Sequence, residues 1–353
     1  VDRITGDVFV ADNGWETWEM IHKLSAGSNC GWPIMEGRAP LRTEVPQGPT
    51  PITPPVKDHP HTEANSVIGG PIYRGAAIPD LKGTFIYGDY ITGTIWGLRS
   101  ASEGEFAHRT LADSELHVVA LHEGSEGEVF VLDYDRTGQL YQLVPSTRQD
   151  NSAQFPRRLS ETGLFDSTEN LAPAAGVYPY SIVAEPWSDG AEAQRWIALP
   201  GRQTVHLDAT DPQQSKFPEG TVLVRHLRLA APQRRLETQI LHLENQQWNP
   251  YSYRWNEEGT DAHLVEPQGT DFDFGEGASR RSWHVGAENE CRLCHSTASG
   301  PVLGFTLRQL DCSTHEGEQV ARLRELEILE ILDSALHADS KLNRLVNPYD
   351  KTA

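Results

Sequence analysis

The sequence has 353 residues, which suggests two or three domains, and its 30 Lys and Arg against 50 Asp and Glu give a formal net charge of −20. No basic cluster occurs, which argues against nucleic acid and anionic membrane surfaces as partners. No apolar run reaches the ~18 residues that a transmembrane helix needs. The sequence begins at Val1 without a signal-peptide pattern, so we expect a fragment whose targeting signal, if any, lies upstream.

Residues 1–146 contain a repeated β-pattern of a turn glycine, a short apolar run and an aspartate. A second strand follows the later two copies, at 92–98 and 137–143. Units of this kind are typical of propeller blades, although a single hairpin could belong to any β-sandwich. Because propellers close with about four to eight blades, we expect residues 1–146 to form part of one. The copies are GDVFVAD at 6–12, GTFIYGD at 83–89 and GEVFVLD at 127–133.

The middle of the chain is also predicted to be β. Residues 147–158 are polar and proline-bounded, which is typical of a linker. Between 159 and 284, several segments alternate apolar and polar residues, as half-buried antiparallel strands do. We predict an independent β-sandwich-like domain over 159–284. Its clearest strands are expected at 194–199, 221–227, 236–243 and 251–255.

The last segment, 285–353, carries the sequence Cys-x-x-Cys-His at Cys291, Cys294 and His295. In a c-type haem site, two thiols at this spacing each add to a haem vinyl group, and the next imidazole binds the iron. The motif therefore assigns Cys291 and Cys294 to thioether bonds and His295 to the iron. Two alternatives stay open. Cys312 and His315 could complete a structural zinc site with the two cysteines, or the thiols could form a metal-free pair.

The segment after the motif is predicted to be helical. Between 318 and 336, apolar residues recur at spacings of three and four, which indicates an amphipathic helix. A helical context favours a small cytochrome c-like segment over a zinc ribbon, which would more often be β. The apolar positions are Val320, Leu323, Leu326, Leu329, Leu332 and Leu336.

The second axial ligand of such a haem is not fixed by the sequence. The two methionines, Met20 and Met35, both lie in the propeller part, so a methionine near the motif is excluded. The ligand could be His284, His315 or His337, or a residue of the C-terminal half that we expect beyond Ala353. We prefer His315, because its segment lies close to the motif in sequence.

Four blocks of the first 146 residues resemble the C-terminal blades of the glucose/sorbosone dehydrogenase family, the soluble sugar dehydrogenases that use pyrroloquinoline quinone (PQQ). The order and spacing of the blocks carry this resemblance. They are WEMIHKL at 18–24, GSNCGWP at 27–33, IGGPIYRG at 68–75 and GTFIYGDY at 83–90.

This resemblance implies roles for a few residues. Tyr73 and Arg74 stand where the family brings polar groups toward the quinone, and an arginine could pair with quinone carboxylates. Asp12 and Glu19 lie near a loop that resembles a calcium-binding region of the family. The family's histidine base belongs to N-terminal blades that this sequence lacks. No catalytic residue is therefore assigned.

The remainder of the chain resembles a bacterial family of c-type cytochromes with two haem motifs, often encoded as fusions to such propellers. The second motif of that family would lie beyond Ala353. The blocks that carry the resemblance are LSETGLF at 159–165, PWSDGA at 186–191, FPEGT at 217–221, YRWN at 253–256 and ECRLCH at 290–295.

Together these patterns predict a mainly β chain: a partial β-propeller, then a β-sandwich-like domain, then a small α-helical cytochrome c-like segment. The expected function is periplasmic or extracellular electron transfer, as a fragment of a PQQ-type dehydrogenase–cytochrome fusion. The complete protein would oxidise a sugar or alcohol with PQQ and calcium, and haem c would pass electrons to a redox partner protein. The alternative is a non-catalytic propeller that serves as a binding module beside a haem or a structural zinc site.

Overall fold

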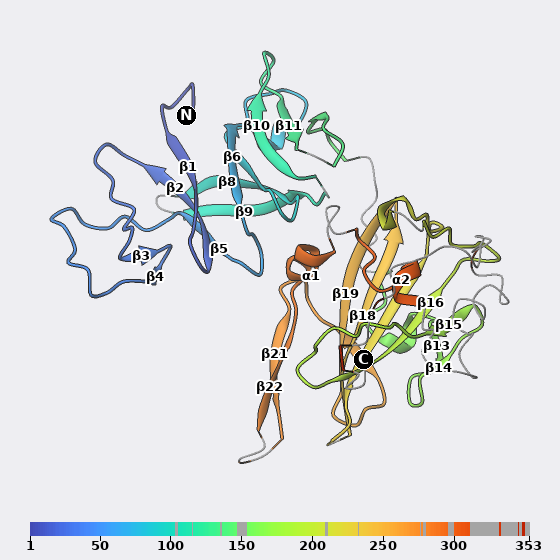
Figure 1. The fold of residues 1–353 in the computed structure, drawn as a ribbon. Helices are drawn as coiled ribbons and strands as arrows, with labels where there is room; N and C mark the ends of the chain where they lie inside the picture. The colour runs from blue at the N-terminus through green and yellow to red at the C-terminus, as the bar shows by residue number, and fades with distance from the viewer. Residues whose placement is uncertain are drawn as a thin grey trace. The chain divides into compact units, whose positions relative to one another are not determined.

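The computed structural model describes two compact units, Val1–Asp150 and Asn151–Ala353. Both are built mainly of β-strands, which confirms the predicted fold class at this level (Figure 1). In the described residues, no helix is long and apolar enough to cross a membrane. The described residues are 1–102, 105–114, 116–134, 136–146, 154–208, 211–231, 233–275, 277, 280–295, 300–310, 332, 345 and 348–349.

The first unit contains three antiparallel sheets that follow one another along the chain. A short hairpin of β3 (Met35–Glu36) and β4 (Ala39–Pro40) and a 3₁₀ turn at Pro79–Leu81 accompany them. The first sheet comprises β1 (Val8–Asn13), β2 (Trp18–Leu24) and β5 (Lys57–Pro60). The second comprises β6 (Val67–Ile72), β7 (Phe85–Asp89), β8 (Ile95–Ser102) and β9 (Glu105–Ala112). The third comprises β10 (Val118–Glu123), β11 (Val129–Asp133) and β12 (Leu140–Gln142).

The repeated sequence pattern corresponds to one strand in each of the three sheets. Gly6, Gly83 and Gly127 precede β1, β7 and β11 with φ values of 75°, 82° and 83°. A side chain is costly in this left-handed region, so glycine is required for the turn into the strand. At the other end of the strands, Asp89 and Asp133 accept hydrogen bonds from backbone N–H groups of the following turn. The pattern is therefore a turn–strand–turn unit.

The middle sheet packs against both of its neighbours. Because side chains alternate along a strand, Phe85 and Tyr87 of β7 join a buried cluster with Ile21 of β2. Ile86, between them, points to the opposite face and joins a second cluster with Val129 of β11. Sheets stacked face to face in chain order are the arrangement of propeller blades.

The second unit is built on one six-stranded antiparallel sheet in which each strand pairs with the next. Its strands are β15 (Val177–Tyr180), β16 (Glu192–Ala198), β17 (Val222–Leu229), β18 (Arg234–Glu244), β19 (Gln247–Trp255) and β20 (Ala262–Leu264). Two hairpins are formed by β13 (Phe165–Ser167) with β14 (Ala172–Pro173), and by β21 (Thr270–Phe274) with β22 (Arg281–Val285). The helical pieces are two 3₁₀ turns, Leu159–Glu161 and Pro212–Gln214, and the helices α1 (Glu288–Cys294) and α2 (Leu307–Leu310).

Different parts of the chain cover the two faces of this sheet. On one face, Leu223 and Leu241 pack with residues of the segment 300–310. On the other face, Val224 and Ile240 pack with the segment that contains β13 and β14. In the described residues, the predicted β-sandwich-like domain is built on a single six-stranded sheet that hairpins and loops cover on both faces. Successive residues of β17 and β18 do point to opposite faces of the sheet, as the sequence pattern predicts, and both faces contain buried residues.

The helix predicted over 318–336 lies almost entirely outside the described residues, as do Cys312, His315 and His337. Within the described part of the second unit, α1 and α2 are short helices of seven and four residues. The helical cytochrome c-like segment therefore stays a prediction.

Candidate functional site

The Cys-x-x-Cys-His motif lies on α1, which follows directly after the hairpin β21–β22. The Glu290 carboxylate accepts a hydrogen bond from the Ala287 N–H at 2.6 Å, which satisfies a backbone donor at the start of the helix. One turn of helix separates Cys291 from Cys294, so both thiols lie on the same side of α1. The helix ends where the N–H of His295 donates to the carbonyl oxygen of Cys291.

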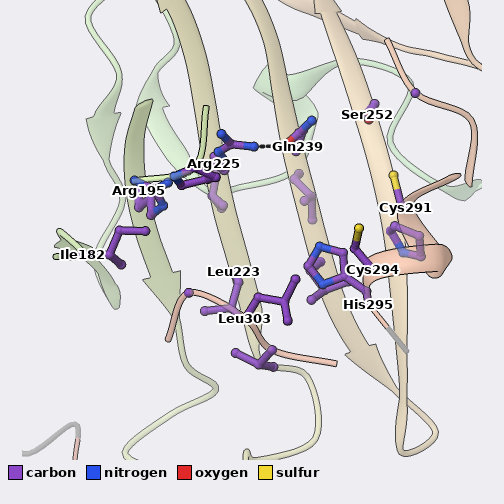
Figure 2. Close-up of a pocket in the computed structure, with 18 of the residues that line it drawn as sticks. Ile182, Arg195, Leu223, Arg225, Gln239, Ser252, Cys291, Cys294, His295 and Leu303 are labelled. Carbon is purple, nitrogen blue, oxygen red and sulfur yellow. Dashed lines mark hydrogen bonds between the residues drawn. The ribbon is translucent and has the colours of Figure 1, made fainter. Parts of the chain in front are cut away.

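The motif forms one wall of a cavity of about 450 Å³ in the second unit, which Figure 2 shows from the side. Cys291, Cys294 and His295 all line it. The opposite wall is the face of the six-stranded sheet that also packs against 300–310. The volume falls in the range of about 300–1,000 Å³ that is usual for small-molecule and cofactor sites.

Two rows of side chains cross the sheet on the cavity face. An apolar row is formed by Leu223, Leu241 and Pro250, which are direct neighbours on β17, β18 and β19. Val302 and Leu303 add apolar surface from the covering segment. This row offers the apolar surface that predominates in sites for hydrophobic cofactors.

The adjacent polar row contains Arg195, Arg225, Gln239 and Ser252, one residue from each of the strands β16 to β19. Figure 2 shows these four labelled side chains along one line of the sheet, with the hydrogen bond between Arg225 and Gln239 drawn. No sequence motif identified them. Their shared position depends on strand register, and the only local signal is that Arg225 alternates with the inward-facing residues of an apolar strand.

His295 is held in one tautomer. Its Nδ1–H donates to the carbonyl oxygen of Pro301 at 2.7 Å, and a carbonyl can only accept. Burial lowers the pKa of His295, so its imidazole is neutral at physiological pH. The lone pair of Nε2 is consequently available to bind a metal, with the ring orientation fixed by the second nitrogen.

The two thiols differ in environment. Burial, reinforced by the nearby carboxylates of Glu237 and Glu288, raises the pKa of Cys291 to about 12, so this residue is a protonated thiol. Cys294 is exposed. The two sulfur atoms are not joined in a disulfide. Both cysteines therefore present thiols at the cavity.

One of the three histidines that could serve as second axial ligand is engaged elsewhere. In His284 of β22, Nδ1 lies 2.7 Å from an oxygen of Asp271 and Nε2 lies 2.9 Å from an oxygen of Glu290. Partial burial acts to lower the pKa of His284, but these two carboxylates outweigh it and raise the pKa. A doubly hydrogen-bonded imidazole of this kind is a poor ligand. No group of three or more His, Cys, Asp or Glu that could hold a metal ion occurs among the residues that the structure describes.

In the first unit, Tyr73 and Arg74 both have partners within that unit. The hydroxyl of Tyr73 is fully buried and donates to Glu128 at 2.6 Å. The guanidinium of Arg74 contacts both carboxylate oxygens of Asp2, and Nε donates at 3.1 Å. These contacts tie the start of the chain and β11 to the end of β6.

The two carboxylates near the calcium-like loop do not converge. Glu19 is buried, accepts the N–H of Val67 at 3.0 Å and lies 3.3 Å from Nε2 of His61. Asp12 is half-exposed and pairs with His22 at 3.7 Å. Each carboxylate therefore has a structural partner of its own.

Comparison with known proteins supports the resemblance of the first unit to sugar dehydrogenases. Residues 1–142 match the glucose/sorbosone dehydrogenase family. An uncharacterized protein of Synechocystis, slr1608, is 26% identical over 144 residues, covering 40% of this chain and 35% of the relative. The HIPL2 protein of Arabidopsis thaliana is 30% identical over 189 residues, covering 47% of this chain and 26% of the relative. The chain therefore spans about a third or less of these relatives.

Among solved structures, a glucose dehydrogenase is similar at 17% sequence identity, with a TM-score of 0.33, over 41% of this chain and 42% of that one. The family match over residues 1–142 shows that the N-terminal region resembles sugar dehydrogenases of the glucose/sorbosone type, a family related to β-propellers.

Proposed function

We propose that this protein transfers electrons through a haem c attached to Cys291 and Cys294, with His295 as an axial ligand of the iron. The observation that carries the proposal is the cavity. One wall presents two thiols and a neutral imidazole whose Nδ1–H donates to the Pro301 carbonyl, and the opposite wall carries an apolar row of side chains beside a polar one. When bound, haem c supplies a one-electron couple at its iron.

The chain's own residues would perform three tasks in this function. The thiols of α1 would hold the porphyrin covalently, and the Pro301 carbonyl would keep the His295 ring oriented. Leu223, Leu241 and their apolar neighbours would keep water from the porphyrin, which tunes the potential of the iron. Covalent attachment through thiols suits an oxidising compartment, so we propose a periplasmic or extracellular location.

The first unit would supply the electrons. Its family match supports an origin in a quinoprotein-type dehydrogenase that oxidises a sugar or alcohol with PQQ and calcium, and a separate redox protein would accept the electrons. The blades that would carry the catalytic base are not part of this sequence. The oxidation step is therefore assigned to no residue of this chain.

A second candidate for the first unit is a non-catalytic propeller that serves as a binding module. The contacts of Arg74 with Asp2 and of Tyr73 with Glu128 favour it, because side chains with internal partners need no quinone. Titration of the full chain with PQQ and calcium, followed by tryptophan fluorescence, distinguishes the two. Saturable quenching supports the quinoprotein, and an unchanged signal supports the binding module.

The haem proposal predicts a coloured protein. Exported from a host with haem c maturation, the chain should show a Soret band that stays with the polypeptide after denaturation. The double variant Cys291→Ser/Cys294→Ser should be colourless, because it lacks both attachment thiols. Cys30→Ser, which changes a cysteine of the first unit, is the matched control and should keep the haem.

Metal analysis of the same preparations tests the zinc alternative. A colourless wild-type protein with one zinc per chain, lost in Cys312→Ser, would reject the haem proposal. A coloured protein in which Cys312→Ser retains the Soret band would reject zinc.

A further inference from the structure

The polar row of the cavity places two arginines side by side. Arg195 and Arg225 are directly opposed on β16 and β17, and both line the cavity. Like charges at directly opposed positions of a sheet repel each other and destabilise it. Because two partly buried positive charges are costly unless they are paired, we expect negative charge near these arginines.

Among the residues that the structure describes, a carboxylate is hydrogen-bonded to only one of the two arginines. Arg195 is 5% exposed and forms a two-pronged ion pair with Glu185, at 2.6 and 2.7 Å. Arg225 instead donates to neutral oxygens, the amide of Gln239 at 3.2 Å and the hydroxyl of Ser188. Its Nε is buried and has no hydrogen-bond partner among the described residues. Arg225 is thus a cation without a hydrogen-bonded carboxylate.

Glu237, a further carboxylate of the region, is linked to Arg225 only through Gln239. Gln239 lies between them, accepting from Arg225 and donating to Glu237 at 3.1 Å. A buried guanidinium with an unused donor costs free energy unless an anion pairs with it. The row therefore forms a site for an anionic group that enters the cavity.

We infer that Arg225, supported by the Arg195–Glu185 pair, binds the propionate carboxylates of the haem attached to Cys291 and Cys294. This inference rests on the proposed function. Attachment of the vinyl groups to the thiols leaves the two propionates as the ionised groups of the porphyrin. A guanidinium matches a carboxylate in a two-pronged, charge-assisted geometry. Ser252, at the end of the row, adds a neutral hydroxyl donor.

Pairing of Arg225 with the propionates affects the potential of the iron. A positive charge held at the porphyrin edge favours the reduced state, which carries one positive charge fewer. Replacing Arg225 with a neutral residue of similar shape should therefore shift the midpoint potential to more negative values. It should also change the vibrations of the propionate groups.

The experiment compares three variants of the full chain, matured with haem: Arg225→Gln, Arg225→Lys and Arg228→Gln. Arg228 lies on the same strand, is 44% exposed and pairs with Glu192 at 3.1 Å, so it serves as the control. Arg225→Gln should lower the midpoint potential and shift the propionate bands in the resonance Raman spectrum. Arg225→Lys keeps the positive charge but loses the two-pronged hydrogen-bonding geometry of the guanidinium, so it should shift those bands with a smaller change of the midpoint potential. Arg228→Gln should change neither.

Each outcome is decisive. If wild type and all variants are colourless, the proposed function fails and the inference fails with it. If all are coloured and Arg225→Gln matches Arg228→Gln in both readouts, the haem stands and the propionate site is wrong. If Arg225→Gln does not accumulate, Arg225→Lys carries the test, and unchanged propionate bands in it overturn the inference.

Discussion

At the scale of single residues, the cavity region contains an unusual carboxyl group. Glu237 is 2% exposed on β18, and it accepts a hydrogen bond from the amide of Gln239 at 3.1 Å. Burial raises the pKa of Glu237 to about 7, despite that hydrogen bond and the positive charge of Arg225. The group is therefore close to half-protonated at neutral pH.

This raised pKa predicts that Glu237 destabilises the fold as the pH rises. Since the folded state holds the proton more tightly, stability is unaffected below the ordinary pKa near 4.5 and falls as the pH rises to about 7. At about 1.4 kcal/mol per pKa unit, the full penalty is about 3 kcal/mol. In the chain expressed without haem, Glu237→Gln should increase the free energy of unfolding by about that amount at pH 8 and by little at pH 5.

Urea unfolding followed by tryptophan fluorescence at the two pH values measures this difference. Glu258→Gln, at an exposed position of the turn after β19, is the control and should have no effect at either pH. An equal gain for Glu237→Gln at both pH values would mean that titration of Glu237 is not its cause.

At the scale of elements, the strands of the first unit depend on glycines whose surroundings differ. A Cβ on Gly6 would meet no atom within 4 Å. A Cβ on Gly127 would lie 2.8 Å from the backbone carbon of Arg74 and 2.9 Å from the nitrogen of Gly75. The two positions share a left-handed φ, so comparing them separates conformational strain from close packing.

We expect Gly6→Ala to lower the free energy of unfolding by about 1 kcal/mol, the cost of a side chain in the left-handed region. Gly127→Ala should cost about 3 kcal/mol or more, because the backbone at Arg74 must also move. Denaturant unfolding of both variants checks the difference. If the two variants lose similar amounts of unfolding free energy, the backbone at Arg74 can move away from Gly127 without an energetic penalty.

The sequence was informative wherever a feature depends on local spacing. The left-handed glycines and the strands after them follow from a seven-residue pattern, and Cys291, Cys294 and His295 share one cavity because they lie on one short helix and the residue that ends it. The polar row could not be predicted in this way. Arg225 alternates with apolar residues of β17, a pattern that by itself favours a solvent-facing position, and its pairing with Arg195 and Gln239 depends on the register of three strands.

The same limit applies to the expected quinone site. The resemblance singled out Tyr73 and Arg74, which directly follow β6, and their partners come from residues 55 and 72 positions away in sequence. Such partners arise only when the chain is folded. The sequence therefore identified Tyr73 and Arg74 as residues of interest, and the fold determined which residues they contact.

At the scale of the whole molecule, each unit has its own core. Buried clusters around Tyr87 and Ile86 stabilise the first unit, and clusters on both faces of the six-stranded sheet stabilise the second. The cavity proposed to hold haem is lined by residues of the second unit. A ligand that binds only a folded unit stabilises that unit and leaves an independent one unchanged.

Calorimetry of the haem-loaded chain should consequently show two unfolding transitions. Removing the haem through Cys291→Ser/Cys294→Ser should lower only the transition of the second unit, by roughly 5 °C or more, since a change of 1 kcal/mol shifts a midpoint by about 2–4 °C in a unit of this size. Gly127→Ala should lower only the other transition, which identifies it as that of the first unit. If both transitions shift in either variant, the two units are energetically coupled, and the stability of each depends on the other.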